Sequence, residues 1–165
     1  MFDTNSQNQI YYHMNSGNAY GDAALNAFDR SLLSAGCGNY NLLKVSSIIP
    51  PGAEMADRID LKEGALLSTA YARLIAGPEE YIDGEISAAV AVGIPKDISK
   101  NGVIMEFSGV CQEQEAKEKA VAMVRTAMAD RKIDDYSIKS VATSCKSTRG
   151  QYNCALAYVA LFEKH

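Results

Sequence analysis

The chain has 165 residues, of which 47% are hydrophobic and 22% are charged, and its formal net charge is -4. This length provides a sizeable core, and the composition excludes disordered, collagen-like and coiled-coil proteins. The acidic balance, without a basic stripe, argues against non-specific binding to nucleic acid or to an anionic membrane, because both require an excess of basic side chains.

The predicted elements begin with a strand over residues 9–14 (QIYYHM). A helix follows, with Leu25, Phe28 and Leu32 at helical spacing, and Gly36 is a typical helix stop. The next apolar segment is predicted to be a strand that ends abruptly at a double proline, because proline cannot continue a hydrogen-bonded ladder. This strand covers residues 41–49.

Turns that contain glycine or proline separate three further strand candidates, which we expect to pair as an antiparallel run. These candidates cover residues 64–76, 85–94 and 102–110. The hydrophobic period then becomes helical over residues 112–132, where acidic residues in the first turn and Arg131 and Lys132 at the end match the helix dipole.

Two last strand candidates, residues 137–148 and 152–163, flank an Arg-Gly turn and predict a hairpin. Because strands and helices do not alternate regularly, the order of elements is α+β rather than βαβ. No repeat or long linker divides the chain. We therefore predict a single α+β domain over residues 1–165.

The sequence carries no recognisable export or membrane-spanning signal. Its longest apolar run, residues 154–162, is far shorter than the ~20 residues that a membrane-spanning helix needs. Residues 1–9 are polar and lack the basic-then-apolar order of a secretory signal. We therefore expect a cytoplasmic protein without a membrane partner.

The cysteine pattern favours a structural role for the thiols. The cysteines are Cys37, Cys111, Cys145 and Cys154. In the cytoplasm they are expected to be reduced, and their irregular spacing, without a CxxC pair, encodes neither a zinc site nor a redox motif. We therefore predict buried or semi-buried structural cysteines. His13 and His165 lack a third partner for a metal site or a catalytic triad.

Common cofactor and nucleophile motifs are missing from the sequence. Residues 36–38 (GCG) supply the first half of a GxGxxG motif, but position 41 is Asn and the glycines follow a predicted helix instead of a strand. The motifs GxxxxGK[ST], HExxH and GxSxG do not occur either. An enzyme with this sequence would therefore not use one of the common external cofactors bound by a recognisable loop.

Two groups of polar residues within predicted strands carry candidate chemistry. Ser46 and Ser47 stand in VSSIIPP, at the end of an apolar strand, where a serine pair alone is ordinary turn chemistry. Glu106 stands in VIMEFSG, where strand alternation sets it with Ile104 and Ser108 on the face opposite the probable core. Taken alone, Glu106 is either on a solvated face or in a site that a pocket or an interface closes off.

A third group comprises Asp29 in LNAFD and the asparagines of the GCGNYN loop, Asn39 and Asn41. Together with the first two groups, these residues make the sequence resemble the pyruvoyl-dependent arginine decarboxylase family. The matching stretches are LNAFDRSLLSAGCGNYNLLKVSSIIPP, GALLSTAYA, GEISAAVAVGIPKD and NGVIMEFSG, in this order over residues 25–109. The serine pair before Ile-x-Pro-Pro is the most specific of these features.

The resemblance implies an αββα sandwich of mostly antiparallel sheets that cleaves its own backbone between Ser46 and Ser47. In this reaction the Ser47 hydroxyl attacks the Ser46 carbonyl in an N-to-O acyl shift. The resulting ester loses its acyl half by β-elimination, which leaves a dehydroalanine that hydrolyses to a pyruvoyl group. The products would be residues 1–46 (β chain) and 47–165 (α chain), with the covalent pyruvoyl group from Ser47 as the cofactor.

The resemblance also implies the roles of the site residues. Glu106 matches the glutamate that returns a proton to the substrate after a Schiff base with the pyruvoyl group has lost carbon dioxide, and a desolvated site would raise its pKa. Asn41 matches an asparagine that assists processing and catalysis, and Asp29 matches a carboxylate that holds the substrate guanidinium. Further matched pocket positions are Leu32, Gly38, Tyr40 and Ile48.

The function implied is the decarboxylation of L-arginine to agmatine and carbon dioxide. The partners implied are copies of the same chain, because the family forms homotrimers of cleaved protomers with active sites at subunit interfaces; a hexamer is a further option. The reaction consumes a proton, so acid resistance and polyamine supply are both open as physiological roles. Two alternatives also stay open: the same chemistry on another amino acid, and a trimeric homologue that is neither processed nor catalytic.

Overall fold

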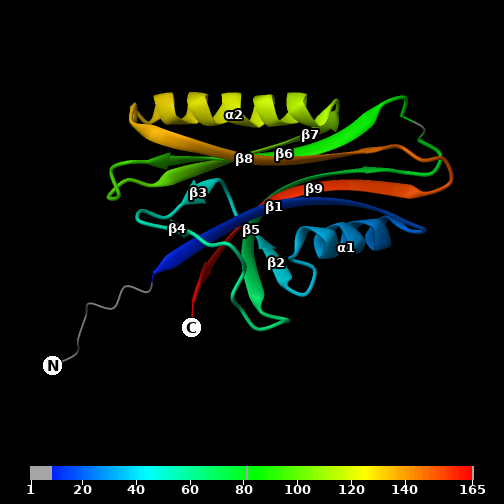
Figure 1. Ribbon diagram of the computed structural model, residues 1–165, viewed down its shortest axis with the longest axis horizontal. Helices are drawn as coiled ribbons and strands as arrows, with labels where there is room; N and C mark the ends of the chain where they lie inside the picture. The colour runs from blue at the N-terminus through cyan, green and yellow to red at the C-terminus, as the bar shows by residue number, and fades with distance from the viewer. Residues whose placement is uncertain (1–8, 81, 165) are drawn as a thin grey trace.

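The computed structural model describes residues 9–80 and 82–164, and these residues form four stacked layers (Figure 1). Helix α2 (Glu113–Asp130) covers one sheet, helix α1 (Ala24–Ala35) covers the other, and the two sheets pack face to face between them. The predicted α+β fold with an αββα sandwich is therefore confirmed.

The sheet next to α1, called sheet A, has the strand order β2 (Asn41–Lys44), β5 (Leu66–Ala76), β9 (Tyr152–Glu163), β1 (Ile10–Gly21) and β4 (Glu54–Met55). The sheet next to α2, called sheet B, has the order β3 (Ile48–Ile49), β7 (Gly102–Val110), β6 (Glu85–Pro95) and β8 (Tyr136–Lys146). Most pairs are antiparallel, and the β1–β4 and β2–β5 pairs are parallel.

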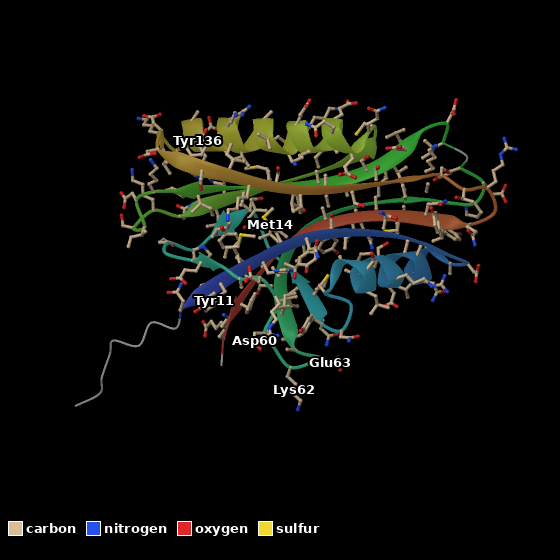
Figure 2. The ribbon with its side chains drawn as sticks, viewed as in Figure 1. Tyr11, Met14, Asp60, Lys62, Glu63 and Tyr136 are labelled. Carbon is tan, nitrogen blue, oxygen red and sulfur yellow. The ribbon has the colours of Figure 1, made fainter. Side chains whose placement is uncertain are left out.

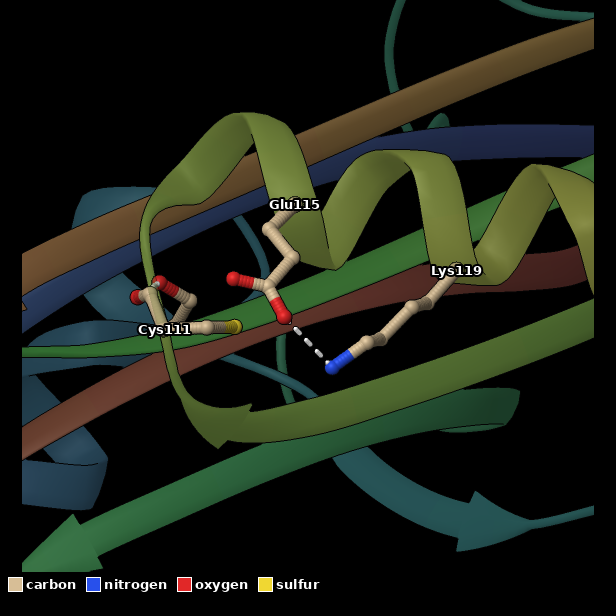
Figure 3. Close-up of polar contacts among 4 residues, drawn as sticks. Cys111, Glu115 and Lys119 are labelled. Carbon is tan, nitrogen blue, oxygen red and sulfur yellow. Dashed lines mark hydrogen bonds and ion pairs between the residues drawn. The ribbon is translucent and has the colours of Figure 1, made fainter.

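Three apolar cores hold these layers together, one at each junction. Strand β6 shows why the central strands read as nearly continuous apolar runs: Val90 and Val92 face sheet A, whereas Ala89 and Ala91 face α2. The surface of α2 that packs on sheet B is built from small residues and Val124 and Met128. On its exposed side, Lys119 forms a 2.7 Å ion pair with Glu115, one helical turn away and close to Cys111 (Figure 3).

Strand β1 is longer than the prediction over residues 9–14, because its second half has a polar sequence that resembles a loop. The structure pairs it with β9 along its whole length. The polar side chains are used in contacts with β8: Ser16 donates to the Ala142 carbonyl at 2.9 Å, and Asn18 donates to Thr143 Oγ1 at 2.7 Å. A side chain at Gly17 would lie 2.7 Å from the Ser31 carbonyl of α1, so glycine permits the close approach of the helix.

Three predictions about the strands are wrong. The segment 41–49 is two short strands, β2 and β3, which belong to different sheets. The predicted antiparallel run is also divided, because β5 lies in sheet A and only β6 and β7 pair with each other. Finally, β8 and β9 do not form a hairpin: β8 pairs with β6 in sheet B, and β9 pairs with β1 and β5 in sheet A.

The predicted helix ends are close to the observed ones. Gly36 follows α1 with a left-handed φ of 84°, and its N–H caps the carbonyls of Leu32 and Leu33. Arg131 follows the last residue of α2 instead of lying in its last turn, and its guanidinium donates to the Ala127 carbonyl at 2.9 Å. None of the helices in the described part of the chain has the length and hydropathy needed to span a membrane.

Candidate active site

The Ser46–Ser47 peptide bond lies where the chain crosses from sheet A to sheet B. The crossing segment is fixed on both sides by the backbone: the Val45 N–H donates to the Thr69 carbonyl of sheet A at 3.2 Å, and the Ile104 N–H of sheet B donates to the Ser47 carbonyl at 2.8 Å. The serines are thus not at the end of one strand, as the sequence predicted, but in a short connection between two strands.

The crossing segment lies beside the open edges of both sheets. Strand β2 pairs with β5 only over Leu66–Thr69, and β3 pairs with β7 only at Gly102 and Val103. Strands β5 and β7 continue to Ala76 and Val110, and no described strand pairs with their outer edges there. This end of the sandwich therefore exposes backbone hydrogen-bonding groups and the space between the sheets.

Glu106 lies on β7 at this open end, two residues after Ile104, which contacts Ser47. The alternation along β7 is as predicted, but the face is not: Ile104 belongs to the core between the sheets, whereas Met105 and Phe107 pack toward α2. Glu106 therefore faces the interior of the sandwich and is half-buried, instead of pointing away from the core.

The environment of Glu106 favours its protonated form. Burial raises the pKa of this carboxyl above its ordinary value of 4.5, and the positive charge of Lys44 partly opposes the increase. Its Oε2 atom is buried and has no hydrogen-bond partner among the described residues. Buried polar atoms are nearly always paired in native proteins, so this orphaned oxygen indicates that Glu106 serves a ligand or a reacting group.

Glu106 forms part of the wall of an open cleft of about 300 Å³ at this end of the sandwich. The residues around the cleft are Lys44, Tyr71, Ala72, Arg73, Glu106 and Ser108. Sequence reasoning missed all of them except Glu106. Lys44 could have been noticed because it stands three residues before Ser47, but only the pairing of β2 with β5 brings it into the cleft.

A second cavity, of about 540 Å³, lies along the crossing segment and includes Ser46 and Ile48 in its wall. The remaining wall is mainly apolar and comes from sheet A, with Leu66 and Leu161 among its residues. Ile48 is itself partly exposed. The backbone around Ser46 is thus accessible from a cavity.

The predicted site residue Asn41 lies away from the cleft in the isolated chain. It begins β2, and its side-chain amide donates to the Gly64 carbonyl at 2.8 Å, while the neighbouring Asn39 donates to Glu63 at 2.9 Å. Figure 2 shows Glu63 and Lys62 on the loop that projects beyond sheet A. Because a strand rises by about 3.3 Å per residue, Asn41 is roughly 10 Å from the Lys44 end of β2.

Asp29 is also separated from Glu106 within one chain. It lies on the exposed side of α1, whereas Glu106 lies on sheet B, beyond sheet A. Of the other predicted pocket residues, Leu32 is buried against sheet A, and Gly38 and Tyr40 are partly buried in the loop after α1. The isolated chain therefore brings together Ser46, Ser47, Ile48 and Glu106, but not the residues of the α1 side.

Among the described residues, the cysteines and His13 line neither of these two cavities. Cys37, Cys145 and Cys154 are buried, as predicted, and burial raises the pKa of Cys37 to about 12 and that of Cys145 to about 11, so these thiols stay protonated. His13 contacts the Ala56 carbonyl through Nδ1 at 3.0 Å. His165 lies outside the described residues. The chemistry available here is that of serine hydroxyls, a carboxyl whose pKa is raised by burial, and a lysine side chain.

Comparison with known proteins agrees with this chemistry. The model of the family described as pyruvoyl-dependent arginine decarboxylase matches residues 11–165, so the similarity extends on both sides of the motif region. The pyruvoyl-dependent arginine decarboxylase of Methanocaldococcus jannaschii is 41% identical over 150 residues, which are 90% of this chain and 87% of the relative.

Two further relatives give the same result. The pyruvoyl-dependent arginine decarboxylase of Methanococcus aeolicus is 42% identical over 141 residues, or 85% of this chain and 82% of the relative. That of Thermococcus kodakarensis is 36% identical over 147 residues, or 87% of this chain and 89% of the relative. The similarity thus covers nearly the full length of these proteins.

Proposed function

Because the chain belongs to the pyruvoyl-dependent arginine decarboxylase family, we propose that it cleaves itself between Ser46 and Ser47 and then decarboxylates L-arginine to agmatine. Membership of this family makes the protein an enzyme, a carboxy-lyase. The observation that carries the proposal of self-cleavage and decarboxylation is the position of Ser47. Its carbonyl accepts a hydrogen bond from Ile104 of β7, two residues before Glu106, whose buried Oε2 atom has no hydrogen-bond partner among the described residues.

The cleavage reaction uses only groups of this chain and water. The Ser47 Oγ attacks the Ser46 carbonyl carbon, and the peptide bond is exchanged for an ester. Loss of the Ser47 Cα proton then breaks the bond between Cβ and the ester oxygen, which releases Ser46 as a carboxylate. The dehydroalanine left at position 47 takes up water and loses ammonia, and residue 47 becomes a pyruvoyl group.

The hydrogen bonds around the scissile bond explain how the fold would withstand cleavage. The new end of residues 1–46 stays on sheet A through Val45, and the new end of residues 47–165 stays on sheet B through the Ser47 carbonyl. The shorter fragment also contains β1, which pairs with β9 from Ile10 to Gly21. We therefore expect the two fragments to remain one folded unit.

In the decarboxylation, the pyruvoyl group supplies a carbonyl that condenses with the substrate amine and accepts the electron pair left by departing carbon dioxide. Glu106 then delivers a proton to the carbon atom that has lost carbon dioxide. Burial keeps this carboxyl protonated to a higher pH than an exposed glutamate, which suits a general acid. The hydrogen bond between Ser47 and β7, the strand that carries Glu106, supports this role.

A second copy of the chain is needed to complete the site. We propose that Asp29, which would bind the substrate guanidinium, and Asn41 act at the cleft of a neighbouring protomer in a homotrimer, with a hexamer as a further option. Leu32, Gly38 and Tyr40 would line the same pocket from the α1 side, and Ile48 from the crossing segment.

Surface features on both sides support this interface. On α1, the exposed Leu25 and Leu33 (74% and 52% exposed) flank Asp29 at helical spacing. Near the crossing segment, Leu43 and Leu66 are exposed beside the open edges of β5 and β7. Such edges and exposed apolar side chains are typical of surfaces that a partner covers.

The identity of the substrate rests on the names of the relatives and on Asp29. The same chemistry on another amino acid is the closest alternative, and a non-processing trimeric homologue is a second. A cytoplasmic location also stays a prediction. The kcat/KM of Asp29→Asn for arginine tests whether a guanidinium substrate is recognised.

Denaturing mass spectrometry of the purified protein, beside a Ser47→Ala control, tests the proposal. We expect a fragment that ends at Ser46 and a second one whose first residue is lighter by one ammonia than serine, and neither in the control. Under native conditions the two fragments should elute together. A single intact chain without arginine decarboxylase activity would contradict the proposed function.

A further inference from the structure

Lys44 is a charged residue of the cleft to which the proposed mechanism gives no role. Resting on the proposed function, we propose that Lys44 is a positioning residue for Glu106: its ammonium group stabilises the carboxylate that Glu106 becomes after giving its proton to the product. Lys44 would thereby set the pH range in which Glu106 can act as an acid.

Two contacts hold the Lys44 ammonium at the open edge of β5. Lys44 is the last residue of β2 and pairs with Thr69; past this point β5 still pairs with β9, but no described strand pairs with its outer edge. There the Lys44 Nζ donates to the Tyr71 carbonyl at 3.3 Å and lies 4.6 Å from the centroid of the Tyr71 ring. The ammonium thus occupies the place of a strand partner's N–H group.

Lys44 and Glu106 act on each other across the cleft. Both side chains line it, and the positive charge of Lys44 lowers the pKa that burial raises. Within the described part of the chain, Lys44 and Glu106 do not form an ion pair within 4.0 Å. The gap leaves the Glu106 Oε2 atom free for a reacting group.

The other polar groups near Glu106 are placed differently. Arg73 also lines the cleft, but its guanidinium lies 4.5 Å from the centroid of the Phe28 ring, on the α1 side of sheet A. Tyr71 of β5 and Ser108 of β7 contribute hydroxyl groups to the cleft. Lys119 of α2 lies over the Phe107 ring, on the opposite face of β7. Lys44 is the cation whose charge lowers the pKa of Glu106.

A general acid in a buried site needs such a cation because it has two tasks. Burial favours the protonated form of Glu106 before the reaction, but the same burial penalises the carboxylate formed by proton donation. A cation across the cleft reduces that penalty, and at this distance it does not deprotonate Glu106 before the reaction. Lys44 therefore makes Glu106 a stronger acid and allows it to pass through the charged state in each turnover.

The test compares Lys44→Met and Lys44→Arg with the wild-type enzyme. In cleaved protein, the carboxyl carbon of Glu106 is titrated by NMR, with its signal identified by its absence in Glu106→Gln, and the pH dependence of kcat is recorded. Lys44→Met should move the Glu106 titration and the alkaline limb of kcat to higher pH, and Lys44→Arg should restore both toward wild-type values. Lys119→Met, on the opposite face of β7, should move neither.

The outcomes separate this inference from the proposed function. An unchanged Glu106 titration in cleaved, active Lys44→Met overturns the role of Lys44 and leaves the proposed function intact. A wild-type protein that neither cleaves nor decarboxylates arginine overturns the proposed function instead. If Lys44→Met does not fold, Lys44→Gln makes the same comparison with another uncharged side chain.

Discussion

Ser47 and Ile104 are joined by a backbone hydrogen bond of 2.8 Å, in which the Ile104 N–H donates to the Ser47 carbonyl. Glu106 lies two residues further along β7 and on the same face as Ile104, because side chains alternate across a strand. One strand thus holds both the residue proposed to become the electron acceptor and the acid proposed to return the proton. The hydrogen bond does not involve the Ser46–Ser47 peptide bond, so cleavage leaves it in place.

The side chain at position 47 should determine the chemistry of the new chain end. Ser47→Thr retains the hydroxyl and should cleave to give a ketobutyryl end, because elimination and hydrolysis leave one additional methyl group. Mass spectrometry should then find a fragment 47–165 that is heavier than the wild-type fragment by one methylene. Ser47→Ala has no nucleophile and should stay intact; cleavage of this variant at the same bond would exclude the acyl-shift mechanism.

Glu106→Gln should separate catalysis from processing. Glutamine cannot act as a general acid, so kcat for arginine should fall roughly 10²–10⁴-fold, whereas cleavage should still occur because Ser46 and Ser47 are unchanged. Carbon dioxide release is measured on protein whose cleavage has been established by mass spectrometry. Glu115→Gln, on the exposed side of α2, serves as the matched control. A Glu106→Gln enzyme with full kcat would show that another group supplies the proton.

The sequence predicted the elements well wherever an apolar period fills the segment, as in β6 and α2. It failed at residues 41–49 because NLLKVSSII contains no glycine or proline that would indicate a break between two strands. The change of pairing partner from β5 to β7 within it depends on long-range contacts that no local pattern records. For the same reason, the Arg-Gly turn before β9 was read as a hairpin, although β8 and β9 belong to different sheets.

The candidate site was predictable only in part. Ser47 and Glu106 were identified from motifs, and in the structure the Ser47 carbonyl is hydrogen-bonded to β7, the strand that carries Glu106. Lys44 escaped notice because its approach to Glu106 depends on the register between β2 and β5. The distance of Asp29 from the cleft could not be foreseen either, since a resemblance gives the role of a residue but not the protomer that supplies it.

The raised pKa of Glu106 has consequences for stability as well as for activity. Burial raises this pKa in the folded protein above the unfolded value, so the stabilising contribution is complete below the unfolded pKa and is lost as pH rises through the folded pKa. In the uncleaved Ser47→Ala protein, the free energy of unfolding should therefore decrease as pH rises from the unfolded to the folded pKa of Glu106. Urea denaturation at fixed protein concentration measures it.

The matched control is the double variant Ser47→Ala/Glu106→Gln, in which the neutral amide replaces the titrating group. Its free energy of unfolding should fall less over the same window, because the other titrating groups are common to both proteins. For kcat the direction is the same: activity that needs protonated Glu106 decreases as pH rises through its pKa. Identical pH dependence in the single and double variants would contradict the raised pKa.

Asp29→Asn should mainly affect the use of arginine. An amide cannot accept the charge-assisted pair of hydrogen bonds from a guanidinium, and breaking such a pair costs about 2–5 kcal/mol, or a loss in kcat/KM of roughly 30-fold or more. Because Asp29 is exposed on α1, the free energy of unfolding should change by no more than about 0.5 kcal/mol. An unchanged kcat/KM for arginine, with folding and cleavage intact, would favour a different substrate.

Mixing Asp29→Asn with Glu106→Gln tests whether one site draws on two protomers. In the isolated chain these residues lie on different layers, so we expect each interface to combine Glu106 of one protomer with Asp29 of the next. Random assembly of the two inactive variants should then restore both wild-type residues at about one interface in four. Activity is measured after co-expression and compared with that of each variant alone.

As a control, the double variant Asp29→Asn/Glu106→Gln is co-expressed with wild-type chain at the same ratio. This mixture gives the same proportions of mixed assemblies as the first one. Recovery of activity in the first mixture requires that a site be shared, because no single chain in it carries both residues. If Asp29 and Glu106 instead act within one chain, the mixture stays as inactive as its components, and the proposal of an active site between protomers is wrong.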